Sequence, residues 1–284
     1  MKEKSVIFIS GVSSGIGYQL VRWFCEDYLV VGTVRNISVK TRLEQEFPDS
    51  IFLIMDLTEE ASIKSAFQRL SDILNSRPLY ALINNAGIAV PGPIAYLDSF
   101  DWERQFKTNV IGLASCIRYA YPLLLKGVIK GRIINVGSVS GLFASPFLGA
   151  YAASKFAVEG LTDSLRRESL FTGIKVVLIE PGPVKTDIWS KSMGLAQKFK
   201  GTEFEEITDR ADEIIRNVES TAMPPQKLHH CFTEALKARR PKHRYLVHKH
   251  PFLMRILAYF VPSRWTDWMV ARQFKAKKNN FRPI

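Results

Sequence analysis

The amino-acid sequence predicts an α/β fold in which helices cover both faces of a single doubly wound parallel sheet. Short apolar runs rich in β-branched residues alternate with longer segments of helical apolar spacing, and this alternation is typical of parallel sheets. The chain has 284 residues, of which 46% are hydrophobic. This is enough to bury the core of one large domain. No internal repeat is visible, so a solenoid is not expected.

Six apolar runs have the length and composition of buried strands, at residues 6–10, 29–34, 51–55, 80–83, 132–136 and 175–179. Apolar side chains recur at helical spacing in the segments between them. Examples are Ile16, Leu20 and Phe24, then Ile63, Phe67 and Leu70, and then Ala157, Leu161 and Leu165. Residues 245–247 are a candidate for one further short strand.

Residues 181–225 break the alternation, with prolines at both ends and polar helical pieces between them. We interpret this segment as a substrate loop that crosses the edge of the sheet at the carboxyl ends of the strands, where doubly wound folds bind ligands. The main domain is accordingly assigned to residues 1–240. A basic, aromatic and helical extension is assigned to residues 241–284.

The formal net charge of +12 is concentrated in that extension. Residues 240–284 contain eleven Lys and Arg and a single acid, Asp267, whereas residues 1–239 are close to neutral. Three separated cysteines form no CxxC pair and no metal-ligand cluster, which indicates a reducing cytoplasm and neither a disulfide framework nor a zinc site. No run approaches the ~18 uncharged apolar residues of a membrane-spanning helix.

A glycine-rich segment, Ser10-Gly11-Val12-Ser13-Ser14-Gly15-Ile16-Gly17, follows the first predicted strand and opens the first predicted helix. Glycines in this position let backbone N–H groups approach a pyrophosphate, to which the helix N-terminus adds partial positive charge. A plain strand-to-helix turn is the alternative. The residues expected to hold a dinucleotide here are Gly11, Ser13, Ser14, Gly15, Ile16 and Gly17.

The end of the second predicted strand indicates which dinucleotide is bound. An acid there would bind the ribose 2′-hydroxyl of NAD and repel a 2′-phosphate. Val34 occupies that place and Arg35 follows it, with a planar guanidinium suited to phosphate. The alternative is a solvated surface arginine. We expect NADP(H) to be preferred over NAD(H).

Tyr151 and Lys155 lie four residues apart, which places them on one face of a helix. A phenol with a pKa of about 10 is a poor base near neutral pH, and a neighbouring ammonium group is expected to lower that pKa toward the working range. Ser138 follows the 132–136 strand, and Asn109 lies on the helix after Asn84-Asn85-Ala86-Gly87. All of these map to one edge of the predicted sheet.

As a set, these residues resemble the short-chain dehydrogenase/reductase family. The matching residues are Gly11-xxx-Gly15-Ile16-Gly17, Asp56-Leu57, Asn84-Asn85-Ala86-Gly87, Asn109, Ser138, Tyr151-xxx-Lys155 and Pro181-Gly182-Pro183-Val184-Lys185-Thr186. They follow the family's order and spacing over residues 4–240. Ser10 stands where the family often has Thr, and both supply a hydroxyl. The resemblance implies a Rossmann fold and a dinucleotide-binding catalytic domain over residues 1–240.

The resemblance also implies roles for the catalytic residues. Tyr151 would be the general acid and base of hydride transfer between a nicotinamide ring and a carbonyl/alcohol pair. Lys155 would lower the pKa of Tyr151 and hold the nicotinamide ribose. Ser138 would orient the substrate oxygen, and Asn109 would hold a water that relays protons from Lys155. Two hydroxyls would polarise the carbonyl, so no metal is expected.

Further coenzyme contacts are implied by the same resemblance. Asp56 and Leu57 would flank the adenine, and Asn85, Ala86 and Gly87 would support the adenosine side and the central sheet. Pro181, Gly182, Val184 and Thr186 would bracket the nicotinamide. Dimers or tetramers are usual in the family, so a homo-oligomer is expected.

Within the family, the sequences around Tyr151 and Arg35 resemble the hydroxysteroid and retinol dehydrogenase-like branch. Together with the long insert and the aromatic extension, they favour a bulky apolar substrate such as a steroid, retinoid or lipid. A reductase of acyl-carrier-protein thioesters shares the same catalytic set and is one alternative. A non-catalytic protein that senses NADP(H) is another, although Tyr151 and Lys155 are both retained.

The extension contains aromatic and aliphatic residues among its cations, including Phe252, Phe260, Trp265 and Trp268. One hypothesis is peripheral contact with a membrane, with the apolar side chains in the headgroup region and the cations facing anionic lipid. The alternative is a helix packed on its own domain or on a partner subunit. Nucleic-acid binding is not expected, because no recognised binding module accompanies the charge.

Overall fold

The predicted α/β fold is confirmed by the structure, a computed structural model that describes residues 3–186, 188 and 195–274. Seven strands form one sheet in the order β3-β2-β1-β4-β5-β6-β7, and each neighbouring pair is parallel. The strands are β1 (Val6–Ile9), β2 (Leu29–Val34), β3 (Ile51–Ile54), β4 (Ala81–Asn84), β5 (Arg132–Val136), β6 (Lys175–Pro181) and β7 (Arg244–Val247). The strand order reverses between β1 and β4, which creates a crevice at their carboxyl ends.

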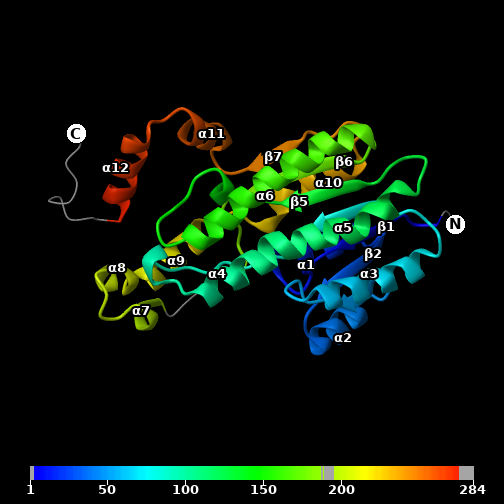
Figure 1. Ribbon diagram of the computed structural model, residues 1–284, viewed down its shortest axis with the longest axis horizontal. Helices are drawn as coiled ribbons and strands as arrows, with labels where there is room; N and C mark the ends of the chain where they lie inside the picture. The colour runs from blue at the N-terminus through cyan, green and yellow to red at the C-terminus, as the bar shows by residue number, and fades with distance from the viewer. Residues whose placement is uncertain (1–2, 187, 189–194, 275–284) are drawn as a thin grey trace.

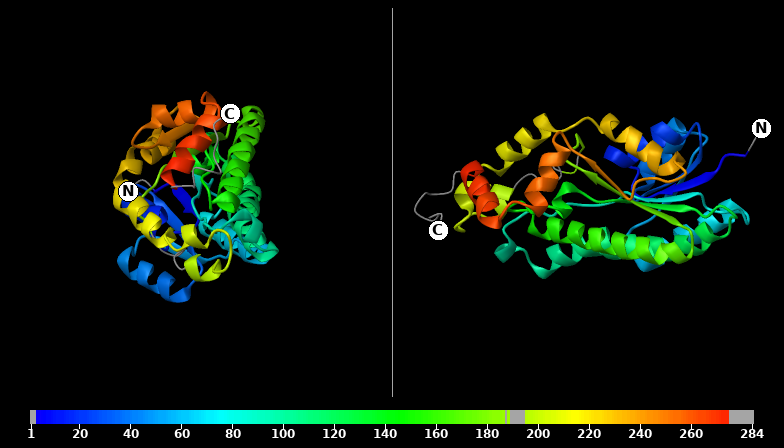
Figure 2. Two further views of the ribbon diagram at one scale, coloured as in Figure 1. Left: turned by 90° about the vertical axis from the view of Figure 1, so that its left-hand side faces the viewer. Right: turned by 90° about the horizontal axis from the view of Figure 1, so that it is seen from above.

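Helices lie on both faces of the sheet, as the view from above in Figure 2 shows. The helices are α1 (Gly15–Phe24), α2 (Ile37–Glu46), α3 (Glu60–Leu74), α4 (Ser99–Phe106), α5 (Gly112–Leu125), α6 (Gly149–Glu168), α7 (Leu195–Lys198), α8 (Glu205–Thr208), α9 (Ala211–Thr221), α10 (His229–Lys237), α11 (Pro251–Tyr259) and α12 (Ser263–Gln273). Figure 1 shows how they surround the strands.

The hydrophobic core is split into two clusters by the sheet. On one face, Phe67 of α3, Leu113 of α5 and Val158 of α6 pack against the strands. On the other face, Phe24 of α1 and Phe232 of α10 do so. Because both faces are covered, the strands are buried along nearly their whole length, which is why the sequence shows apolar runs and no alternation.

The last strand, β7, lies in the 241–284 extension and completes the sheet of the main domain. Its register with β6 pairs Arg244 with Leu178 and Tyr245 with Ile179. The candidate strand at 245–247 is therefore present and begins one residue earlier, at Arg244. Helices α11 and α12 follow it at the end of the molecule that also carries α7, α8 and α9 (Figures 1 and 2).

The 181–225 segment leaves the sheet at the end of β6 and returns before α10, as its prolines suggested. Its two ends are pinned together by backbone hydrogen bonds from Met223 N to Pro183 O (2.8 Å) and from Lys185 N to Met223 O (2.9 Å). The short helices α7, α8 and α9 lie between them. The segment therefore forms a closed excursion at the carboxyl edge of the strands.

Candidate active site

The glycine-rich segment connects β1 to α1 and has the conformation that its glycines predict. Gly11 and Gly15 adopt positive φ angles of 71° and 59°, a region that side-chain-bearing residues rarely occupy. Gly17 has an ordinary φ but no room for a side chain. A Cβ atom there would lie 2.1 Å from the Gly11 carbonyl oxygen and 2.5 Å from Asn85 Nδ2.

The end of β4 holds this loop in place. Asn85 Nδ2 donates to the carbonyl oxygens of Ser10 (3.1 Å) and Gly11 (2.8 Å). In return, the Ser10 hydroxyl accepts from the backbone N–H groups of Asn85 and Ala86, both at 3.1 Å. Asn85 and Ala86 therefore hold the loop in place. Ser10 supplies here the hydroxyl that the family often takes from Thr.

A cavity lies beside this loop at the ends of β2 and β3. Its lining residues are Ser13, Arg35, Asn36, Ile37, Val39, Ile54 and Asp56. A second cation, Arg42, donates to the Ser13 carbonyl oxygen at 3.2 Å. Asp56 accepts from the backbone N–H and the hydroxyl of Thr58, both at 2.8 Å. Leu57 differs from its neighbour, because its side chain is buried in the core on the α3 and α5 face.

These residues fit the dinucleotide that the sequence implied. The loop exposes backbone where a Cβ atom would collide with its neighbours, and the adjoining cavity is lined by a guanidinium group. Backbone N–H groups that a ligand can approach closely bind a pyrophosphate, and a nearby cation binds a phosphate group on the ribose. Gly11, Ser13, Ser14, Gly15, Ile16 and Gly17 would hold the phosphates, with Arg35 and Asp56 on the adenosine side.

A second cavity, of about 330 Å³, adjoins the loop on the other side and contains Ser138, Tyr151 and Lys155 together. Ile16, Asn85 and Gly87 reach it from the coenzyme side. Pro181, Gly182, Val184 and Thr186 line it from the end of β6. A Cβ atom on Gly15 would lie 3.1 Å from the Thr186 side chain, so the 181–186 segment lies next to the glycine loop.

Tyr151 lies in the first turn of α6, and its side chain is buried. Burial raises the pKa of the phenol above its usual value, because the interior disfavours the phenolate, and a hydrogen bond with the Ser138 hydroxyl opposes this rise only in part. Ser138 Oγ also accepts from the backbone N–H of Ser140 at 3.1 Å. The Tyr151 pKa is therefore shifted upward, opposite to the lowering expected from the sequence, because burial outweighs the hydrogen bond with Ser138.

Lys155 is buried beneath Tyr151. Its Nζ donates to the carbonyl oxygen of Val136, at the end of β5, at 2.9 Å and lies 5.8 Å from the centroid of the Tyr151 ring. Burial lowers the pKa of Lys155 to about 8, although the Glu159 carboxylate one turn further along α6 raises it. The lysine is thus tied to the sheet and carries a charge that is sensitive to pH near 8.

Asn109 lies in a π-helical turn, Lys107–Ile111, between α4 and α5. Such turns frequently mark functional positions. The Asn109 side chain makes two hydrogen bonds with the backbone of Ile88: Oδ1 accepts from Ile88 N (2.9 Å), and Nδ2 donates to Ile88 O (3.0 Å). Nδ2 also donates to Ser154 Oγ (3.1 Å). A Cβ atom on Gly87 would lie 3.3 Å from Asn109 Oδ1 and 3.8 Å from Lys155 Nζ, so Gly87 lies beside both side chains.

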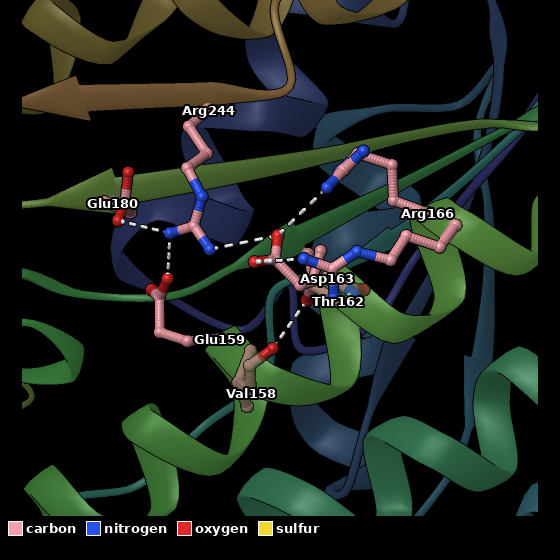
Figure 3. A network of polar contacts seen from close by, with 9 residues as sticks. Val158, Glu159, Thr162, Asp163, Arg166, Glu180 and Arg244 are labelled. Atoms are coloured by element: carbon pink, nitrogen blue, oxygen red, sulfur yellow. Dashed lines mark hydrogen bonds and ion pairs between the residues drawn. The ribbon is translucent and has the colours of Figure 1, made fainter.

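A partly buried ionic cluster joins α6 to β6 and β7 (Figure 3). Arg244 of β7 pairs with Glu159 of α6, and also contacts Glu180 at 3.1 Å and Asp163 at 3.1 Å. Burial raises the pKa of Glu159 to about 7, further raised by Glu180, whereas Arg244 opposes the shift. Glu159 Oε1 is buried with no hydrogen-bond partner in the described part of the chain. The lysine and this cluster are therefore electrostatically linked through Glu159.

The rest of the larger cavity is apolar and comes from three separate parts of the chain. Its walls include Phe143, Phe147 and Leu148 before α6, Ile207, Ile215 and Val218 on α8 and α9, and Val270 and Phe274 in and directly after α12. Phe147 joins these parts, since its ring lies 5.8 Å from that of Phe204 and 5.9 Å from that of Phe274. It does so with a φ of 63°, which is unusual for a bulky residue.

Sequence reasoning missed Phe147, Glu159, Arg244, Val270 and Phe274. Glu159 could have been found, because it continues the four-residue spacing of Tyr151 and Lys155 along the same face of the helix. Arg244 carried no local signal, since its partners come from α6 and β6. The two residues of α12 reach the cavity only through the path that the chain takes after β7.

The comparison with protein families agrees with this geometry. Residues 5–194 match the family model described as short chain dehydrogenase. The chain belongs to this family. It is therefore an oxidoreductase acting on a CH–OH/C=O pair.

Two curated relatives place it more closely. The chain is 33% identical over 278 residues to an NADPH-dependent 3-dehydrocapnine reductase of Ornithobacterium rhinotracheale, covering 94% of this chain and 96% of the relative. It is 30% identical over 259 residues to retinol dehydrogenase 7 of Rattus norvegicus, covering 86% and 80% of the two chains. The retinol and hydroxysteroid dehydrogenase-like branch expected from the sequence is thereby confirmed.

Solved structures agree in fold. A short-chain dehydrogenase from Streptomyces avermitilis superimposes with a TM-score of 0.78 at 22% identity, covering 96% of this chain and 98% of that one. ElxO with NADP bound superimposes with a TM-score of 0.71 at 23% identity, covering 88% and 99%. Both confirm the Rossmann fold predicted from the alternation of strands and helices.

Replacing Gly17 by Ala is expected to weaken NADPH binding by at least ~10-fold. The added methyl must displace either the Gly11 carbonyl or the Asn85 amide, which together shape the loop. Fluorescence titration of bound NADPH measures the effect. Gly160→Ala on α6 is the matched control, because its Cβ meets nothing within 4 Å, and equal affinities of the two variants would contradict the assignment of the loop.

Proposed function

We propose that the protein is an NADP(H)-dependent oxidoreductase that reduces the carbonyl group of a bulky apolar substrate. The observation that carries the proposal is one cavity in which Ser138, Tyr151 and Lys155 meet apolar walls from α8, α9 and α12. Polar groups at one end and apolar walls elsewhere suit a substrate with a single carbonyl on a large hydrocarbon body. A steroid, a retinoid or a long-chain lipid has this character.

The protonation state of Tyr151 favours reduction. The bound coenzyme supplies the hydride, and this chemistry belongs to the coenzyme itself. Because burial raises its pKa, Tyr151 keeps its proton near neutral pH and acts as the general acid that protonates the substrate oxygen. Ser138, which hydrogen-bonds to Tyr151, donates to the same oxygen and stabilises the charge that develops there.

Lys155 and Asn109 act behind Tyr151. The Lys155 ammonium, held against the Val136 carbonyl, stabilises the phenolate left after proton transfer and holds the nicotinamide ribose. Both Nδ2 hydrogens of Asn109 are engaged by protein, so a relay water would be held by the second lone pair of Oδ1, which faces Gly87 and Lys155.

The preference for NADP(H) rests on Arg35 and on the lack of an acid at the end of β2, where Val34 stands. A guanidinium group in the cavity beside Ser13 suits a 2′-phosphate. The relative from Ornithobacterium rhinotracheale, which is named as NADPH-dependent, supports the same choice. Oxidation of NADPH by a panel of apolar ketones and aldehydes, with a β-ketoacyl thioester in parallel, tests the substrate class, and preferential turnover of the thioester would reject it.

Tyr151→Phe is expected to lower kcat/KM by ~10²- to 10⁴-fold, because it removes the general acid while leaving the ring in place. NADPH binding should persist, which shows that the variant is folded. Tyr119→Phe is the control, since the Tyr119 hydroxyl bonds only to the exposed Glu60 among the described residues and lies on α5. Full turnover by Tyr151→Phe would refute the assigned role.

The rate of reduction is expected to fall as the pH rises through about 8, where Lys155 loses its proton. Since the Glu159 carboxylate raises the pKa of Lys155, Glu159→Gln should move this decline to lower pH. Profiles of kcat/KM against pH measure the shift. Glu168→Gln, at the exposed end of α6, should leave the profile in place. An unchanged pH profile of Glu159→Gln would mean that the ionic cluster around Arg244 does not influence catalysis.

Arg35→Ser is expected to lower kcat/KM with NADPH by at least ~10-fold and to leave that with NADH nearly unchanged, because only NADPH carries the 2′-phosphate. Steady-state kinetics with the two coenzymes give the ratio. Arg118→Ser on α5 serves as the control, because this arginine pairs with Glu60 away from both cavities. An equal loss with both coenzymes would mean that Arg35 does not read the phosphate.

A further inference from the structure

Helices α11 and α12 expose an unusual concentration of large apolar side chains. Phe252, Phe260 and Trp265 are 76%, 80% and 69% exposed. The other members of this set are Leu253, Tyr259, Trp268 and Met269, and we refer to all seven as the α11–α12 face. No residue of α11 is buried, so this helix is not packed as a core element although most of its residues are apolar.

The same two helices carry a cationic excess. Lys249, Arg255, Arg264 and Arg272 lie between residues 249 and 274, where Asp267 is the only acid. Arg255 and Arg272 are exposed beside the apolar residues, and Arg272 lies over the ring of Trp268. Aromatic rings interleaved with cations are the composition of a helix that lies at an anionic lipid surface.

We propose that the α11–α12 face binds the surface of an anionic lipid bilayer. The helices lie on that surface, because no helix among the described residues is long and apolar enough to cross a membrane. The exposed rings enter the headgroup region, and the arginines contact the lipid phosphates. Binding is peripheral, and it is weakened by salt because part of it is electrostatic.

Helix α12 is fixed to the protein through its opposite side. Thr266 is buried, Val270 and Phe274 line the active-site cavity, and Arg210 donates to the Phe274 carbonyl oxygen at 3.4 Å. The packing on its own domain, one of the two alternatives for the extension, thus accounts for one side of α12. It leaves Trp265, Trp268 and Met269 of the same helix exposed.

The charge favours lipid over a second copy of the chain as the occupant. A two-fold dimer through this face would bring the same patch against itself and would place the arginines of both copies in one interface. Residues 249–274 carry four Lys and Arg against one acid, Asp267, so two such faces would repel each other. Anionic phosphates attract this net positive charge, while the headgroup region accepts the rings.

Co-sedimentation of the full chain with vesicles tests the proposal without coenzyme or substrate, so its outcome is independent of the proposed function. The protein is expected to pellet with phosphatidylcholine vesicles that contain phosphatidylglycerol, and less with pure phosphatidylcholine. The triple variant Phe252→Ser, Phe260→Ser, Trp265→Ser should lower binding at least ~10-fold. The double variant Arg255→Gln, Arg272→Gln should bind the anionic vesicles more weakly by a similar factor. Its binding to pure phosphatidylcholine vesicles should stay unchanged.

The matched control is Ile129→Ser with Phe171→Ser, since these side chains are 78% and 91% exposed but belong to the segments that enter the amino ends of β5 and β6. This control should pellet like the wild type. Circular dichroism and thermal unfolding confirm that every variant is folded. The proposal is overturned if the wild type stays in solution with anionic vesicles, or if the triple variant pellets equally. It is also overturned if the wild type does not bind vesicles but forms a dimer in analytical ultracentrifugation, and if the triple variant does not form this dimer.

Discussion

The parallel direction of all seven strands is the constraint on which the active site depends. It brings the carboxyl ends of β1, β4, β5 and β6 to one edge, and these ends carry the glycine loop, the Asn85 clamp, Ser138 and the 181–186 segment. Helix α6 then needs only to pass this edge to place Tyr151 and Lys155 between them. The hydrogen bond from Lys155 to the end of β5 fixes that position.

Burial sets the chemistry of this edge as much as proximity does. It keeps the Tyr151 phenol protonated and makes the Lys155 charge sensitive to pH, in each case by penalising the charged form. Glu159 supports the Lys155 ammonium, but it is itself buried and depends on Arg244 of the last strand. The acid–base behaviour of α6 is therefore linked to the strand that ends the sheet.

Sequence reasoning reached the sheet and its strands because buried parallel strands appear as continuous apolar runs, each close to its observed position. It also anticipated that Ser138, Tyr151 and Lys155 lie together, because each is fixed by local geometry at a strand end or on one helix face. It failed on the pKa of Tyr151, since spacing shows a neighbouring charge but not the burial that opposes it. Leu57 was placed with Asp56 beside the adenine, yet in the turn after β3 its side chain is buried in the core. The apolar walls were beyond reach, since Phe147, Ile207 and Val270 meet only through tertiary packing.

The position of α12 has a consequence for how the protein comes together during synthesis. The glycine loop, the Asn85 clamp and the 181–186 segment all come earlier in the chain than Val270 and Phe274, which form one wall of the substrate cavity. The coenzyme half can thus assemble while the cavity is still open on one side. This wall is therefore completed after the segments around the glycine loop, and a protease cut before α12 would open the cavity while sparing those segments.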